Sequence, residues 1–291
     1  MTRPKIGCGQ ITWRGQPEED ALRDIAAAGY AGAPAPLTPG ESPEAVIARF
    51  ARFGLKPAPP YFGAPFQDPA AEADILGGAR EIARFTRIVG CTELYVAASG
   101  DGFRAPSGAT RREVAGHVGP NDAMSDTEFN QFARVLSAFA RTTLEEGVRS
   151  CFHNHVGTVI ETGDELDRLL SLADPGAVFL GLDTGHLAWA GEDAVAICRK
   201  YADRIRTLHL KDVDEAVRRR GVAAGWDYGT FTAKGIFAEL GEGCVDFPAI
   251  LADLKARSFD GWLIVETDVT RKPSALESAT ISRDYLRGLG L

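Results

Sequence analysis

The sequence lacks any long apolar run. No window of about 18 residues is free of polar side chains, and the N-terminal residues MTRPKIGCGQITW contain no hydrophobic stretch ahead of a cleavage site. We therefore expect a cytoplasmic protein without a membrane-spanning segment.

Basic clusters are also absent. Lys and Arg together number 32 against 40 Asp and Glu, the formal net charge is −8 and the isoelectric point is near 5.3. This balance argues against nucleic acid or an anionic membrane as the main partner. We expect the partner to be a small molecule, and leave open whether the chain forms a homo-oligomer.

Cysteine is scarce and is not arranged for metal binding or cross-linking. The chain has five cysteines and no Cys-x-x-Cys pair, so we expect reduced, small core residues. Linkers and internal repeats are lacking as well. With 291 residues and 45% hydrophobic content, the chain can bury one large core, and we expect a single domain over 1–291.

Short apolar stretches alternate with helical patterns along the chain. Strands are predicted over residues 5–13, 30–36, 55–62, 93–99, 148–155, 178–183, 205–211 and 261–267. Helices are predicted over residues 17–29, 42–54, 68–89, 125–147, 162–173, 192–204, 247–258 and 274–290. This alternation predicts an α/β fold, a (β/α)8 TIM barrel. Segments 100–126 and 212–246 are too long for ordinary connections, and we expect them on the catalytic face.

Polar side chains follow the later strands where each strand ends. His153 and His155 are two residues apart, so both side chains point to the same side of the fifth strand. Asp183 ends the sixth strand, where a carboxylate is costly to desolvate unless a cation or hydrogen-bond donors compensate. Because the C-terminal strand ends of a parallel barrel converge on one mouth, these side chains are candidates for one site.

The last two strands end in the same way. His209 and Lys211 share one side of the seventh strand, and Glu266 follows an apolar run in the eighth. Asp183, His209 and Glu266 are thus ligand candidates from three successive strands. Glu161, just before a predicted helix, is either a site carboxylate or one that only benefits from the helix dipole.

A set of carboxylates and imidazoles suits a divalent transition metal. We expect one such ion, Mn²⁺ or Co²⁺ first, with Zn²⁺, Fe²⁺ and Mg²⁺ as alternatives. It would bind a ketone oxygen and a neighbouring hydroxyl, and stabilise the enediolate formed when a base removes the proton α to the carbonyl. Nearby histidine, glutamate and lysine would supply the base and the acid.

The strand ends HNH, DTGH, HLKD and VET, with GEGCVDFPAIL at 241–251, resemble the xylose-isomerase-like superfamily of sugar isomerases and epimerases. FHNHVGTVIET, LDTGHLAWAGEDAV and YADRIRTLHLKDV are most similar to inosose (2-keto-myo-inositol) dehydratases. The resemblance runs from about Gly147 to the C-terminus. GAPAPL stands where many relatives have a glutamate after strand two. His153 stands where isomerases have a metal-binding glutamate, a departure that inosose dehydratases share.

This resemblance implies roles for single residues. It implies metal ligands at Asp183, His209 and Glu266, with a fourth from either Glu161 or His153. The catalytic candidates are His153, His155 and Lys211. His186 and Lys211 match substrate-contacting positions of the family. We expect Gln10 and Trp226 as further substrate contacts.

We therefore expect a metal-dependent lyase that eliminates water from a cyclic keto-polyol such as 2-keto-myo-inositol. A strand-five histidine or Glu161 would take the α-proton, and another acid would protonate the departing hydroxyl. Isomerisation or epimerisation of a ketose and β-elimination of a 3-keto-glycoside share the first half of this mechanism and stay open. A non-catalytic sugar-binding barrel would not need metal and base together, and the acidic composition disfavours an endonuclease acting on abasic DNA.

Overall fold

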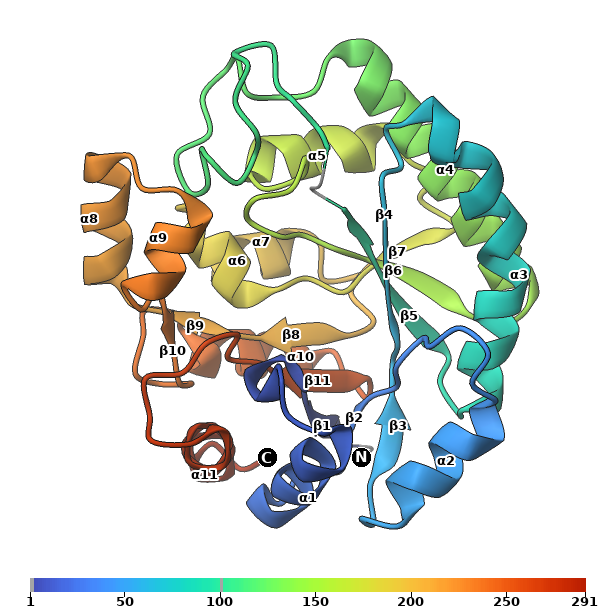
Figure 1. The fold of residues 1–291 in the computed structure, drawn as a ribbon, viewed down its shortest axis with the longest axis vertical. Coiled ribbons are helices and arrows are strands. Elements are labelled where there is room, and N and C mark those ends of the chain that lie inside the picture. The colour runs from blue at the N-terminus through green and yellow to red at the C-terminus, as the bar shows by residue number, and fades with distance from the viewer. Residues whose placement is uncertain (1–2, 100–101) are drawn as a thin grey trace.

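Eight short parallel strands form the centre of the computed structural model, which describes residues 3–99 and 102–291 (Figure 1). The strands are β1 (Lys5–Cys8), β2 (Gly32–Pro34), a third in two parts, β3 (Lys56–Ala58) and β4 (Tyr61–Ala64), then β5 (Glu93–Ala98), β6 (Arg149–His153), β7 (Val178–Leu180), β8 (Leu208–Leu210) and β11 (Trp262–Val265). Each lies within or overlaps a predicted strand, but most are shorter. The first ends at Cys8, and a turn of 3-10 helix, η1 (Ile11–Trp13), follows it.

Pairing between the strands closes the barrel. One sheet has the order β4-β5-β6-β7 and another the order β3-β2-β1-β11-β8. Isolated parallel bridges join β7 to β8, one of them between Asp183 and His209. The third strand is divided at Pro59 and Pro60, which have no N–H to give to a sheet, so β3 pairs with β2 and β4 with β5. The (β/α)8 barrel expected from the alternation of elements is confirmed.

Helices surround the strands (Figure 1). They are α1 (Glu18–Ala28), α2 (Pro43–Ala51), η2 (Pro69–Ala71), α3 (Glu72–Ile88), α4 (Asp126–Glu145), α5 (Gly163–Leu172), α6 (Thr184–Trp189), α7 (Ala194–Lys200), α8 (Glu215–Ala224), α9 (Tyr228–Ala233), α10 (Phe247–Ala256) and α11 (Ala275–Gly288). Side chains cap the predicted starts: Ser42 accepts from the N–H of Ala45, and Ser125 forms a capping box with Glu128. Among the described residues, no helix has both the length and the apolar character needed to cross a membrane.

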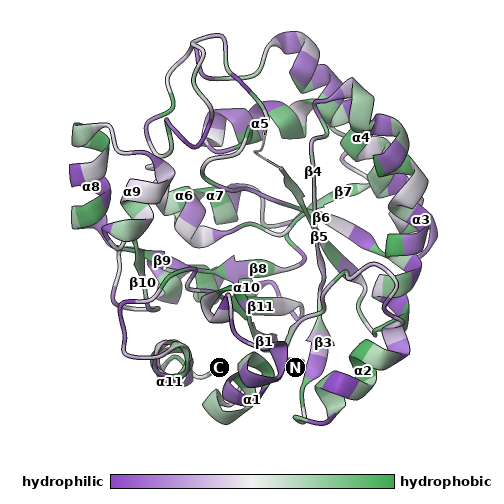
Figure 2. Ribbon diagram, in the orientation of Figure 1, coloured by the Kyte–Doolittle hydropathy of each residue, from purple (hydrophilic) through white to green (hydrophobic). Residues whose placement is uncertain are grey.

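The helices bury one face against the barrel. In α4, Phe129, Phe132, Leu136 and Phe139 recur at the spacing of one helical face and are at most 1% exposed. Hydrophilic and hydrophobic residues accordingly alternate along α3 and α4 (Figure 2). This burial holds the strands in the register that determines where their C-terminal ends lie.

The second long segment, 212–246, is mostly regular structure. It contains α8 and α9, flanked by the antiparallel pair β9 (Asp212–Val213) and β10 (Phe237–Ala238). The first long segment has little regular structure up to α4, and its residues 100 and 101 lie outside the described part. A hydrogen bond connects the two segments, from the ring of His117 to the carbonyl oxygen of Trp226 at 2.9 Å.

Arg111 fixes the first segment to α5. Its guanidinium is fully buried and donates to both carboxylate oxygens of Glu165, at 2.8 and 2.9 Å, and to the carbonyl of Asp122. Glu165 also accepts the N–H groups of Glu161 and Thr162 at the start of α5. A planar guanidinium that meets a carboxylate with two parallel hydrogen bonds is a strong and directional anchor.

A second fixed point lies at Gly116. Its N–H donates to Glu161 at 2.7 Å, and its φ of +77° is in the left-handed region that favours glycine. A Cβ at this position would lie 2.7 Å from the ring nitrogen of Trp189. Backbone conformation and close approach therefore both require glycine here.

Replacing Arg111 by Met should destabilise the protein by about 3–5 kcal/mol, because the carboxylate of Glu165 would stay buried without its partner. Urea unfolding followed by circular dichroism measures this loss. The matched control is Arg112→Met, next in the chain. Arg112 is exposed and lies 4.0 Å from the ring of Tyr228, so its loss should cost about 1 kcal/mol or less. Equal losses in the two variants would contradict the anchor.

Candidate active site

A cavity of about 370 Å³ opens at the C-terminal ends of the strands. Its polar wall is made of side chains in or just after the C-terminal ends of β6, β8 and β11, namely His153, His155, His209, Glu266 and Asp268. Its apolar wall lies at the C-terminal ends of β1 and β2, and includes Ile11, Pro34, Ala35, Pro36 and Leu37. The cavity thus lies where the sequence predicted that the polar strand ends converge.

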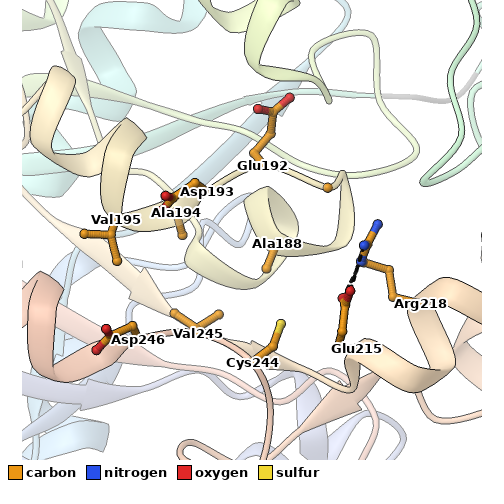
Figure 3. Close-up of a pocket in the computed structure, with 11 residues that line it drawn as sticks. Ala188, Glu192, Asp193, Ala194, Val195, Glu215, Arg218, Cys244, Val245 and Asp246 are labelled. Carbon is orange, nitrogen blue, oxygen red and sulfur yellow. Dashed lines mark hydrogen bonds and ion pairs between the residues drawn. The ribbon is translucent and has the colours of Figure 1, made fainter.

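A second hollow, of about 340 Å³, lies between α6, α7 and the residues before α10 (Figure 3). Its carboxylates already have partners. Asp193 and Asp246 cap α7 and α10, Glu192 accepts a backbone N–H at the start of α5, and Glu215 pairs with Arg218. These groups hold the fold together, so we assign the candidate site to the mouth of the barrel.

Asp183 uses its two carboxylate oxygens differently. Oδ1 accepts the N–H of His186 at 2.9 Å and so caps α6. Oδ2 is fully buried and has no hydrogen bond. The Asp-x-x-His spacing thus forms a helix start that leaves one oxygen available, and burial raises the pKa of this carboxyl. Burying this oxygen without a hydrogen bond is costly unless cations lie nearby, and the closest one is the ammonium of Lys211 at 3.3 Å.

Two imidazoles face this oxygen. His153 lies with Nδ1 3.1 Å from the carbonyl of Gly181, which fixes Nδ1 as the N–H donor and leaves the Nε2 lone pair 3.9 Å from Asp183 Oδ2. His209 has no hydrogen bond on either ring nitrogen, and its Nδ1 lies 3.7 Å from Asp183 Oδ2 and 3.3 Å from Glu266 Oε2. Burial lowers the pKa of His153 well below its usual value, so this imidazole is neutral.

These four side chains fit a divalent cation. Atoms of His153, Asp183 and His209 lie within 4.8 Å of one another, and Glu266 reaches the same space through its contact with His209. Lone pairs of carboxylates and imidazoles repel one another when buried together, and a divalent ion bound between them would turn that repulsion into attraction. Two nitrogen and two oxygen donors suit Mn²⁺, Co²⁺, Fe²⁺ or Zn²⁺.

The side chain of Lys211 lies beside this group and is 1% exposed. Its Nζ is 3.3 Å from Asp183 Oδ2, 3.2 Å from Glu266 Oε2 and 2.5 Å from Asp268 Oδ1. Burial alone would lower the pKa of Lys211, but the three carboxylates raise it well above its usual value. The lysine is therefore an ammonium ion at rest, at the mouth of the barrel.

A second group of potential ligands lies on the other side of Lys211. It consists of His155, His186 and Asp268, whose ligand atoms are within 4.8 Å of one another. The rings of His155 and His186 lie 3.7 Å apart, centre to centre. His155 Nδ1 is 2.7 Å from the carbonyl of Val156, which leaves Nε2 unprotonated, and burial lowers the pKa of His155 to about 3.

The remaining candidates have different surroundings. Gln10 lines the cavity, and its amide nitrogen donates to the carbonyl of Pro34 at 3.0 Å. Trp226 is not among the residues that line the cavity and packs against Phe231. Asp268, which the sequence analysis missed, lines the cavity two residues after Glu266. The two-residue spacing that drew attention to His153 and His155 would have indicated it.

Glu161 lies apart from the ligand groups. Its carboxylate accepts the N–H groups of Gly116 and Gly157, both at 2.7 Å, and lies 3.9 Å from Arg111. Burial raises the pKa of Glu161 to about 7, although Arg111 and the two N–H donors act in the opposite direction. Its described contacts hold the first long segment in place. Of Glu161 and His153, the two candidates for the fourth ligand, only His153 faces Asp183.

Comparisons of sequence and of structure with known proteins all find TIM barrels of one family or proteins that share this fold. The family model described as "Xylose isomerase-like TIM barrel" matches residues 22–288. An inosose dehydratase of Geobacillus kaustophilus (strain HTA426) is 31% identical over 282 residues, which cover 91% of this chain and 87% of that protein. The rhizopine catabolism protein MocC of Rhizobium meliloti is 40% identical over 141 residues, 48% of this chain and 43% of MocC. The probable 3-DHS dehydratase AsbF from Bacillus anthracis shares the fold, with a TM-score of 0.71 and 15% identity over 97% of this chain and 98% of AsbF.

The buried carboxyl of Glu161 should make stability depend on pH. Between its ordinary pKa of 4.5 and about 7, the folded chain keeps a proton that the unfolded chain has released, so the free energy of unfolding falls as pH rises. The loss attributable to this carboxyl is about 3 kcal/mol. Glu161→Gln removes it, and urea titrations of both proteins at pH 4.5 and pH 8 isolate the effect. A difference between them that does not change with pH would mean that Glu161 is ionised throughout.

Proposed function

The chain belongs to the xylose isomerase-like TIM barrel family, and we propose that it is a dehydratase that removes water from a cyclic polyhydroxy ketone, such as inosose, with one divalent metal ion. The observation that carries the proposal is the set of four ligand atoms, from His153, Asp183, His209 and Glu266, that face one another beside a buried lysine. A relative that covers 91% of this chain is named an inosose dehydratase, which supports the choice of substrate class.

The ion would be held by His153 Nε2, Asp183 Oδ2, a ring nitrogen of His209 and Glu266. We favour Mn²⁺ or Co²⁺ because both accept mixed nitrogen and oxygen ligands and keep positions for a substrate. When bound, such an ion withdraws charge from a ketone oxygen and so makes a proton on the neighbouring carbon more acidic.

His155 is the base in this proposal. Its Nδ1 is committed to the carbonyl of Val156, so the lone pair on Nε2 is the one that can accept a proton. Contact with the ring of His186 limits its rotation. His155 lines the cavity and can therefore take the proton from the carbon next to the carbonyl.

Lys211 is the acid that completes the elimination. As the proton leaves the carbon, a carbon–carbon double bond forms, the bond to the β-hydroxyl breaks, and an ammonium proton of Lys211 joins the departing oxygen to give water. The three neighbouring carboxylates keep this lysine charged before the reaction. Proton return from His155 to Lys211 would restore both groups.

The apolar wall of the cavity suits a ring rather than an open chain. A cyclic polyol presents a face of C–H groups, which can pack on Ile11, Pro34, Pro36 and Leu37. On the same side, Gln10 offers the one amide group among the residues that line the cavity. Hydroxyl groups at the ring edge would then point towards the polar wall.

Metal content tests the ligand assignment. Asp183→Asn and Glu266→Gln should each lose most of the bound ion, because each removes one of the two anionic ligands, whereas the wild type should hold about one ion per chain. Elemental analysis after dialysis measures occupancy. Asp193→Asn serves as control, since Asp193 caps α7 and should leave occupancy unchanged. Full metal occupancy in both ligand variants would contradict the assignment of Asp183 and Glu266 as ligands.

The reaction type is tested in D₂O with inosose. We expect exchange of the proton next to the carbonyl, detected by NMR, together with a product that absorbs in the near ultraviolet. His155→Ala should keep the metal but slow exchange by roughly 10²-fold or more. Exchange without the chromophore would favour an epimerase or isomerase. Tight binding of inosose, keto-glucosides and ketoses with neither exchange nor product would favour a sugar-binding protein.

A further inference from the structure

Lys211 separates two groups of side chains that could each bind a cation. The first group holds the proposed metal ion. The second, His155, His186 and Asp268, is the other set of His, Asp and Glu residues within the described ranges whose ligand atoms converge to within 4.8 Å. Two imidazoles and a carboxylate are an ordinary ligand set for a divalent transition metal.

The ammonium group of Lys211 already occupies the second group. Its Nζ lies 3.1 Å from His186 Nε2 and 2.5 Å from Asp268 Oδ1. Asp268 Oδ1 is buried and has no hydrogen bond in favourable geometry, so this ammonium is the cation that it contacts. A metal ion bound to the same atoms would overlap with Nζ.

Charge balance also points to one metal ion. Asp183, Glu266 and Asp268 bring three carboxylates around the single ammonium of Lys211. Formally this leaves two negative charges, which one divalent ion neutralises. A second divalent ion would leave the buried site with excess positive charge, which is unfavourable at low dielectric.

We propose that the ammonium of Lys211 takes the place of a second metal ion, and that this keeps the lone pair of His155 available as the base. The inference rests on the proposed function, since it takes the first metal site and the role of His155 from there. An ion in the second group would bind His155 through Nε2, its one unprotonated nitrogen, and would abolish its basicity. Lys211 would thus contribute both a proton and protection against a second ion.

The experiment counts Co²⁺ or Mn²⁺ ions per chain by elemental analysis after equilibrium dialysis, and follows the Co²⁺ absorption bands. The wild type should bind one ion, and Lys211→Met should bind two, with a second set of Co²⁺ bands. Lys211→Met combined with Asp268→Asn should return to one. Lys200→Met, which removes an exposed lysine paired with Asp167, is the matched control and should bind one.

The outcomes separate this inference from the function on which it rests. A wild type that binds no ion refutes the proposed metal site. One ion in both the wild type and Lys211→Met refutes the role of Lys211 alone, as do two ions in the wild type. Circular dichroism checks folding in the presence of metal. If Lys211→Met does not fold, Lys211→Gln removes the same charge with a polar side chain and should likewise bind two.

Discussion

Burial of negative charge is the constraint that shapes the mouth of this barrel. Asp183, Glu266 and Asp268 lose most of their hydration there, and the cost of that loss has to be met by cations within contact distance. The ammonium of Lys211 offsets part of this desolvation cost. The negative charge that Lys211 does not neutralise makes the cavity an anionic pocket beside an apolar wall, suited to a divalent ion and a neutral, hydroxyl-rich ring.

Much of the fold could be predicted because strands such as β5, β8 and β11 are buried on both faces and read as short apolar runs. The helix α6 was missed, since its six residues are too few to show periodicity and the Asp183 that caps it had been interpreted only as a ligand. The helices within 212–246 could not be predicted from the sequence for another reason. In α8, Val217 and Gly221 are the buried residues, so almost no apolar pattern marks it as a helix.

The strand-end residues of the candidate site could be predicted because alternation along a strand is local. His153 with His155, and His209 with Lys211, follow from two-residue spacing alone, and Asp268 would have followed from Glu266 by the same rule. The surroundings of Glu161 could not be foreseen. Its partner Gly116 is 45 residues away in an irregular segment, and no sequence pattern connects the two.

Asp183 gives the site a property that neither of its roles has alone. One of its oxygens starts α6 and the other faces the proposed ion, so helix formation and ion binding share one carboxylate. The helix α6 carries His186 and Trp189, and Trp189 lies against Gly116 of the first long segment. Stabilising the start of α6 therefore also stabilises the residues that contact this segment. Binding of the proposed ion to Oδ2 would therefore be thermodynamically linked to the stability of α6.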